Sequence, residues 1–153
     1  MHLYLARHGE CSSTSLEPSL SEQGKKDIQK LSSLLKPLNI QIENIFHSGK
    51  LRAKQTAELL QQNILCSHEI TEKQGLNPND DVVYWAEQLI HFKHDILLVG
   101  HLPFMSKLVS QLITNNEQPE VVHFHPGTFV CLEHFGDARW AIDFVIHPSL
   151  IQS

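Results

Sequence analysis

The chain has 153 residues, of which 41% are hydrophobic and 19% are charged. This composition is typical of a globular protein and excludes disordered and fibrous classes. The formal net charge of −5 argues against a nucleic-acid binder, which would carry a basic balance or a basic stripe. No apolar run approaches the roughly 20 residues that span a bilayer, and Met1–Tyr4 lacks the basic start of a signal peptide. We therefore expect one cytoplasmic, monomeric domain over residues 1–153, with no nucleic-acid or membrane partner.

The cysteine and histidine counts limit the metal and disulfide chemistry. The three cysteines, Cys11, Cys66 and Cys131, are odd in number, far apart and not arranged as CxxC. Neither a disulfide framework nor a zinc knuckle is indicated. The unusual count is that of histidine, with 11 residues.

Apolar periodicity in the first half of the chain predicts alternating strands and helices. The predicted elements are a strand over 2–7, a polar loop over 12–15, a helix over 21–36, a strand over 44–47, a helix over 50–62 and a short strand over 69–71. Ser21 is a suitable N-cap for the first helix, and Pro37 ends it.

The second half begins with the same alternation and ends in strands. The predicted elements are a turn-rich loop over 75–81, a helix over 81–91, a buried strand over 96–99, a helix over 103–113 and strands over 121–124, 129–134 and 140–146. Alternation predicts an α/β fold, a three-layer α/β/α sandwich with a mixed and mainly parallel sheet. The last strands follow one another without a helix, so part of the sheet is expected to be antiparallel.

Three of the predicted strands end in similar residues. The first ends at Arg7-His8-Gly9-Glu10, the second at His47-Ser48-Gly49 with Arg52 one turn later, and the buried strand at Gly100-His101-Leu102-Pro103. Ligands of open α/β sheets bind beyond the carboxyl ends of the strands. A lone arginine or histidine at such a place is usually a surface charge or a packing residue. Their joint placement instead predicts a shared site.

The chemistry of these residues suits a phosphoryl group. Arg7 and Arg52 offer planar forks of donors, and helix N-termini near Gly49 and Leu102 add backbone amides. A neutral histidine in such a pocket is a nucleophile, and a second, charged histidine would stabilise the extra charge of the transition state. A neutral His8 and a charged His101 predict a bell-shaped pH profile. The arginines supply the positive charge that Mg²⁺ supplies elsewhere, so no metal or other cofactor is expected.

These residues resemble those of the histidine phosphatase superfamily, also called phosphoglycerate mutase-like. Its Arg-His-Gly triplet corresponds to residues 7–9, and its Gly-His-x-Pro block to residues 100–103. Its Ser-x-x-x-Arg-Ala-x-x-Thr-Ala block is matched by residues 48–57, and a Leu-Ser-x-x-Gly stretch by residues 20–24. The resemblance implies a phosphoglycerate mutase-like fold. It implies that His8 is the phosphorylated nucleophile and that the phosphate pocket is completed by Arg7, Arg52, His101 and Ser48.

The branch of the family is suggested by length. Mutases and phytases carry insertions that roof the pocket, whereas only 44 residues run from Ala57 to Gly100, which leaves little room for a lid. An open pocket suits a phosphate presented by another protein. The stretch over residues 76–80 also resembles the Leu-x-Pro segment of SixA-type phosphohistidine phosphatases. The resemblance thus implies a phosphohistidine phosphatase whose partner is a phosphohistidine-bearing signalling protein, for example a phosphotransfer domain.

The general acid is the weakest match to the family. Mutases use a glutamate of the middle region, and the spacing of Glu72, Asp80 and Asp81 does not match it. An imidazole leaving group, with a conjugate-acid pKa near ~6.5, needs less acid assistance than an alkoxide. Glu10 is a candidate secondary acid or base and substrate contact, and a solvated loop carboxylate is the alternative interpretation.

The sequence raises three other hypotheses. The histidine pairs 91/94 and 123/125 have spacings that zinc sites use, but no HExxH motif or thiolate accompanies them, so no metal site is predicted. A phosphohistidine-binding adaptor without turnover would not need His8 as a nucleophile. A small-molecule phosphomonoesterase of the same superfamily is the alternative enzyme. Trp85 and Trp140 lie in apolar periodic runs and are expected in the core.

Overall fold

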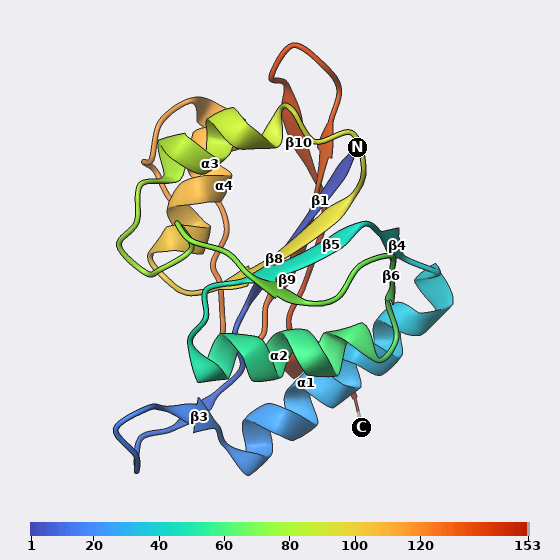
Figure 1. Ribbon diagram of the computed structural model, residues 1–153, viewed down its shortest axis with the longest axis vertical. Coiled ribbons are helices and arrows are strands. Elements are labelled where there is room, and N and C mark those ends of the chain that lie inside the picture. The colour runs from blue at the N-terminus through green and yellow to red at the C-terminus, as the bar shows by residue number, and fades with distance from the viewer. Residues whose placement is uncertain (153) are drawn as a thin grey trace.

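The computed structural model describes residues 1–152 and shows a sheet between two pairs of helices. In Figure 1, α1 (Glu22–Leu35) and α2 (Leu51–Gln61) cover one face of the sheet, and α3 (Val82–Leu89) and α4 (Phe104–Thr114) cover the other. The predicted three-layer α/β/α sandwich is confirmed.

The sheet has six strands in the order β10-β9-β1-β8-β5-β7. Its strands are β1 (His2–Arg7), β5 (Asn44–His47), β7 (Thr71–Glu72), β8 (Ile96–Gly100), β9 (Phe129–His134) and β10 (Trp140–Ile146). Pairs among β1, β8, β5 and β7 are parallel, whereas β9 is antiparallel to both β1 and β10. The mixed, mainly parallel sheet follows the prediction, because a hairpin and not a helix connects β9 and β10.

Alternation along β1 divides the core between the two faces. Leu3 and Leu5 belong to the cluster that packs against α3 and α4, and Tyr4 and Ala6 belong to the cluster that packs against α1 and α2. Side chains of a strand point alternately to opposite faces, so four successive apolar residues require helices on both sides. The strand is thereby tied to both layers.

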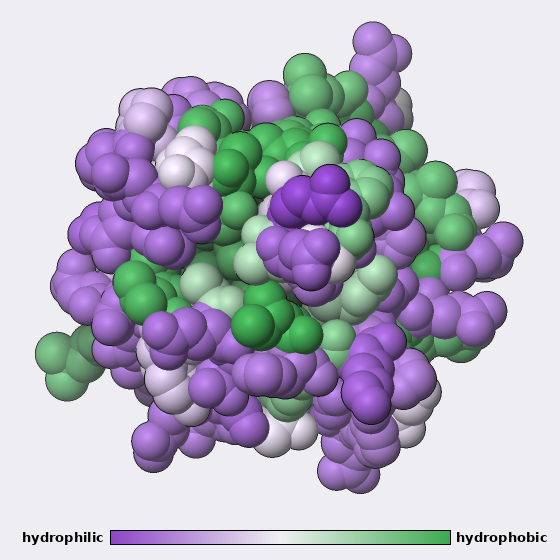
Figure 2. All heavy atoms as spheres, turned by 90° about the horizontal axis from the view of Figure 1, so that it is seen from above, coloured by the Kyte–Doolittle hydropathy of each residue, from purple (hydrophilic) through white to green (hydrophobic). Residues whose placement is uncertain are grey.

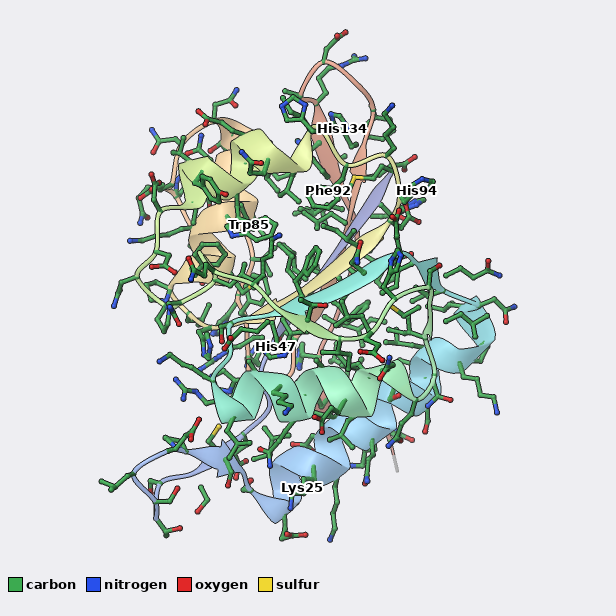
Figure 3. The ribbon with its side chains drawn as sticks, viewed as in Figure 1. Lys25, His47, Trp85, Phe92, His94 and His134 are labelled. Atoms are coloured by element: carbon green, nitrogen blue, oxygen red, sulfur yellow. The ribbon has the colours of Figure 1, made fainter. Side chains whose placement is uncertain are left out.

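Helix termini and buried aromatic residues agree with the sequence. Ser21 caps α1 by accepting a hydrogen bond from the Gly24 amide at 3.0 Å. Trp85 and Trp140 are both buried, and Trp85 of α3 lies between its helix and the sheet, near Phe46 (Figure 3). No helix within residues 1–152 is long and apolar enough to cross a membrane.

Several elements are too short to show a periodic pattern of apolar residues, so they could not be predicted from the sequence. The polar loop over 12–15 belongs to a hairpin of β2 (Cys11–Ser12) and β3 (Ser19–Leu20). A second small sheet pairs β4 (Gln41–Ile42) with β6 (Leu65–Cys66), and 3₁₀ turns occupy η1 (Lys36–Leu38) and η2 (Pro148–Leu150). The strand predicted over 69–71 overlaps the observed β7 only at Thr71, because β7 begins two residues later and ends one residue later.

The strand predicted over Val121–Phe124 is wrong. Val122 and Phe124 are buried as an alternating pattern requires, but the segment joins no sheet. Both edges of β1 are already taken by β8 and β9, and the Phe124 carbonyl accepts a hydrogen bond from the Arg7 guanidinium at 2.8 Å. The segment therefore packs beside the sheet and presents its backbone to an arginine.

Candidate active site

The predicted site residues meet at one end of the sheet. Arg7 is level with Gly100 in the β1–β8 pairing, and His47 is level with Val99 in the β5–β8 pairing. The three strand ends therefore lie side by side, at the end of the sheet from which β1 leads to the β2–β3 hairpin in Figure 1. The rings of His8 and His101 have centroids 5.1 Å apart.

His8 is held in the tautomer that a nucleophile needs. Its Nδ1 lies 2.8 Å from the Gly9 carbonyl oxygen, and because a carbonyl only accepts, Nδ1 carries the proton. The lone pair of the neutral ring is then on Nε2. Burial lowers the pKa of His8 to about 4, with further lowering by Arg52 and Arg7. The imidazole is therefore neutral at physiological pH.

His101 follows β8 and is buried beside the loop that follows β5. Its Nε2 lies 2.6 Å from Ser48 Oγ, and its Nδ1 has no hydrogen-bond partner among the described residues. Burial, followed by the proximity of His8 and Arg52, lowers the pKa of His101 to about 3. Desolvation and positive neighbours therefore oppose, in the ligand-free protein, the charged state that was expected for His101 during catalysis.

The two arginines flank this histidine pair from different elements. Arg7 at the end of β1 donates from Nη1 to Phe124, which anchors its guanidinium, while its buried Nε has no partner among residues 1–152. Arg52 lies in the first turn of α2, and its charge lowers the pKa values of both His8 and His101. Lys50 also lowers the pKa of His101, a proximity that sequence reasoning missed. The arrangement has the positive charge and fixed donors of an oxyanion site.

Thr56 connects the nucleophile loop to α2. Its buried Oγ1 accepts a hydrogen bond from the Gly9 amide at 3.1 Å and donates to the Arg52 carbonyl at 2.9 Å. One hydroxyl therefore fixes the loop that carries His8 to the helix turn that carries Arg52. The motif contains this threonine, but its spacing gives no hint of the contact.

The loop after β5 is shaped around Gly49. This residue has φ +92°, and a Cβ there would overlap the Glu72 carboxylate of β7. Its amide donates to Nδ1 of the buried His47 at 3.0 Å (Figure 3 labels His47 at the end of β5). The tight turn places Ser48 beside His101 and directs the chain into α2.

The remaining predicted contacts lie at the rim. Ser48 is in the site through His101, whereas the exposed Glu10 carboxylate accepts a hydrogen bond from Ser21 Oγ at 3.1 Å. At the N-terminus of α2, the Leu51 amide donates to the Glu17 carboxylate at 3.1 Å. This amide is therefore already occupied, and the predicted contribution of free backbone amides at α2 is reduced.

Two surface features border the site. A groove of about 550 Å³ begins at Ser48 and is lined by Glu72, Lys73, Asn77, Asp80 and Tyr84 among others. On the side of Arg7, the rings of His123, His125 and His147 form a column with centroid separations of 4.2 and 4.3 Å. Within residues 1–152, neither the pair His91 and His94 nor the pair His123 and His125 belongs to a group of three potential metal-binding side chains.

Comparison with known proteins agrees with the motifs and the fold. The family described as histidine phosphatase superfamily (branch 1) matches residues 3–77. No curated protein matches the chain in sequence. The solved structure of the protein histidine phosphatase SixA complexed with tungstate superposes with a TM-score of 0.88 at 20% identity, covering 98% of this chain and 99% of that one.

Other solved structures share the fold at lower identity. The α-ribazole phosphatase from Shigella flexneri has a TM-score of 0.75 at 16% identity, with 97% of each chain covered. The phosphoserine phosphatase from Entamoeba histolytica, in complex with 3-phosphoglyceric acid, has a TM-score of 0.71 at 15% identity, covering 94% of this chain and 95% of that one. The family match over residues 3–77, the ordered motifs and the shared fold all indicate the histidine phosphatase superfamily for this chain.

Proposed function

We propose that the chain hydrolyses phosphohistidine on a partner protein through a phosphoryl intermediate on His8. The observation that carries the proposal is the hydrogen bond between His8 Nδ1 and the Gly9 carbonyl. It leaves the Nε2 lone pair of a neutral ring in a site flanked by two arginines. A residue that served only to bind an anion would be more useful as a charged imidazolium.

In the first step, His8 Nε2 attacks the phosphorus, and the bond between phosphorus and the substrate imidazole breaks. The leaving nitrogen retains the electron pair of that bond and takes a proton. Arg7 and Arg52 bind the non-bridging oxygens as charge moves onto them. In the second step, water attacks phosphorus and loses a proton to the phosphate oxygens or to solvent, the bond to His8 breaks with its electron pair returning to Nε2, and inorganic phosphate leaves.

His101 acts as a ligand-dependent donor in this scheme. The ligand-free pocket holds its pKa low because the neighbouring charges are positive. A phosphoryl dianion reverses the sign of the local field, which raises the pKa of His101 and favours a proton on Nε2. Ser48 Oγ, at 2.6 Å from that nitrogen, keeps the ring oriented before substrate binds.

The preference for phosphohistidine rests on three supports. An imidazole leaving group needs little acid assistance, and the nearest carboxylate on the nucleophile loop, Glu10, is exposed and bonded to Ser21. The 44 residues from Ala57 to Gly100 include no long insertion that could cover the site, so a phosphate on another protein could reach it. The SixA structure that shares the fold is that of a protein histidine phosphatase.

A small phosphomonoester is the second candidate substrate. The groove that begins at Ser48 has room for the body of such a molecule beside the phosphate site. Structures named α-ribazole phosphatase and phosphoserine phosphatase share the fold. A phosphomonoester would require a proton donor for its alkoxide, and Glu72 lies in this groove against Gly49.

A substrate panel separates these candidates. Initial rates would be measured on a phosphohistidine protein, α-ribazole phosphate, phosphoserine and simple sugar phosphates, each with and without a chelator. We expect the highest kcat/KM on the phosphohistidine protein and no effect of the chelator on the initial rate. When the enzyme concentration is comparable to that of the substrate, we expect a burst of the dephosphorylated product. A clear preference for a phosphomonoester would transfer the chain to the second candidate, and binding without a burst would indicate an adaptor.

A further inference from the structure

A second cluster of reactive side chains lies at the opposite end of the sheet. His2, Cys131 and Asp143 each contribute one potential ligand atom, and the three atoms all lie within 4.8 Å of one another. Within residues 1–152, no other group of three or more potential metal-binding side chains lies this close together. It joins an imidazole, a thiol and a carboxylate from three adjacent strands, β1, β9 and β10.

The register of the sheet explains how distant residues meet there. Cys131 of β9 is paired with Tyr4 of β1 on one side and with Phe144 of β10 on the other. His2 lies two residues before Tyr4 and therefore on the same face, where its ring stacks on Tyr4 with centroids 6.3 Å apart. The β1 and β9 contributions thus converge on the face covered by α1 and α2.

Asp143 reaches the cluster through an irregularity of β10. The pairing of β10 with β9 shifts between Ile142 and Phe144, so Asp143 is an extra residue without a direct partner. A β-bulge redirects the side chain of the extra residue. One oxygen of the Asp143 carboxylate lies 4.0 Å from Cys131 Sγ, and the carboxylate forms no ion pair with the chain over residues 1–152.

Asp95 orients the histidine. Its carboxylate accepts the backbone amide of His2 at 2.6 Å and lies 3.4 Å from the Nδ1 of the same residue. Zinc-binding histidines are usually held in this way by a second carboxylate. His2 is near the chain terminus, and this double contact restrains its ring.

We propose that His2, Cys131 and Asp143 form a binding site for a zinc ion. Zinc accepts sulfur, nitrogen and carboxylate oxygen together in a tetrahedral shell, and three protein ligands leave one position for water. Magnesium and calcium would disfavour the thiolate and the imidazole. The 4.8 Å limit on the separations means that the ligands need to move by only a few tenths of an ångström to about one ångström to close on an ion.

The site would join β1 to the β9–β10 hairpin, and it does not take part in phosphoryl transfer. His2 and His8 are at opposite ends of β1, and five residues of strand at ~3.3 Å each separate His2 from Arg7 by about 17 Å. Zinc bound only by the folded protein would raise its thermal stability. It would leave the initial rate of the phosphatase reaction unchanged.

The test uses the full chain without an affinity tag, so that no added histidines bind metal. Co²⁺ is titrated first, because a cobalt ion with a thiolate ligand gives a sulfur-to-metal charge-transfer band, and Zn²⁺ is then added to displace it. We expect one ion per chain, a charge-transfer band lost on adding Zn²⁺, and a higher melting temperature with Zn²⁺. Cys66→Ala is the matched control, and it should retain the band.

Three variants decide whether the assigned ligands are correct. Cys131→Ala should abolish the charge-transfer band. Asp143→Asn and His2→Gln alter exposed or half-exposed side chains, and each should weaken Zn²⁺ binding by about tenfold or more while the protein remains folded. The proposal is overturned if the wild type gives no thiolate band, if the band is lost in Cys66→Ala, or if Asp143→Asn and His2→Gln both bind Zn²⁺ as tightly as wild type.

Discussion

The two ends of the central sheet have opposite electrostatic character. At the carboxyl end of β1, Arg7, Arg52 and Lys50 surround two histidines and lower their pKa values. At the amino end, burial raises the pKa of the Cys131 thiol to about 12, with further raising by Asp143 and Asp95. Burial also raises the pKa of Tyr4, followed by the effects of Cys131 and Asp95.

The comparison shows that burial keeps groups neutral at both ends, for different chemical purposes. A neutral imidazole keeps its lone pair and is a ready nucleophile, so desolvation of His8 favours phosphoryl transfer. A neutral thiol is inert until a cation draws off its proton. This difference fits the two proposals, a phosphoryl group at the first end and a zinc ion at the second. From the amino end, the surface in Figure 2 mixes hydrophobic and hydrophilic side chains without one broad apolar face.

The largest expected effect comes from removing the nucleophile at the cationic end. His8→Ala should lower kcat/KM by at least about 10³-fold and eliminate the acid-labile phosphoenzyme seen on rapid quenching. His91→Ala, which removes an exposed imidazole just after α3, is the control and should change the rate little. Near-normal turnover of His8→Ala would exclude His8 as the phosphoryl acceptor.

The next largest effect is expected from the two arginines at the cationic end, because lysine keeps the charge and loses the fork of donors. Arg7→Lys or Arg52→Lys should each reduce kcat/KM by about 30- to 1,000-fold, which is ~2–4 kcal/mol of transition-state stabilisation. The exposed Arg139→Lys serves as the control. If both site variants stay within about threefold of wild type, charge alone is sufficient.

A smaller effect is expected from Thr56→Val, which keeps the shape and removes the hydroxyl between Gly9 and Arg52. The Gly9 amide is then buried without a partner, at a cost of about 1–3 kcal/mol in the free energy of unfolding. Denaturant unfolding measures this loss, and kcat should fall because the loop of His8 is less well positioned. The exposed Thr71→Val should change neither quantity, and an unaltered Thr56→Val protein would show that the bridge is dispensable.

The last prediction concerns the pH dependence of stability. The unfolded chain takes up protons on His8 and His101 near pH 6.5, whereas the folded chain resists them down to about pH 4 and about pH 3. The unfolded state therefore binds more protons in that window, and stability falls as the pH drops from 6.5. The free energy of unfolding between pH 7 and 4 should decline less steeply in His101→Gln than in wild type. Parallel slopes would mean that other groups account for the decline.

Much of the fold could be predicted because its signals are local. The apolar period of 21–36, the Ser21 cap and the continuous apolar run of β8 are properties of neighbouring residues, and all three agree with the structure. The ends of β1, β5 and β8 could be predicted to lie close together, because the carboxyl ends of parallel strands lie at the same edge of a sheet. Two-residue strands such as β2 and β3 could not, since two residues establish no period.

Other features depend on which groups meet in space. Residues 121–124 alternate like a strand, yet both edges of the neighbouring β1 are taken by β9 and β8, and Arg7 donates a hydrogen bond to the Phe124 carbonyl. The low pKa of His101 likewise reflects burial first, and then His8 and Arg7 at the end of β1 and Arg52 and Lys50 at the start of α2.

The amino-acid sequence was enough to predict that Arg7, His8, Arg52 and His101 lie together, because they follow strand ends that a parallel sheet must align, and their chemistry led to the proposed phosphate pocket. The hydrogen bonds by which Thr56 joins Gly9 to Arg52, and the bulge in β10 that brings Asp143 to Cys131, are known only from the folded structure. Those contacts depend on the packing of a helix and on the register of a hairpin. Both are settled by long-range burial and pairing, which leave no periodic mark on the chain.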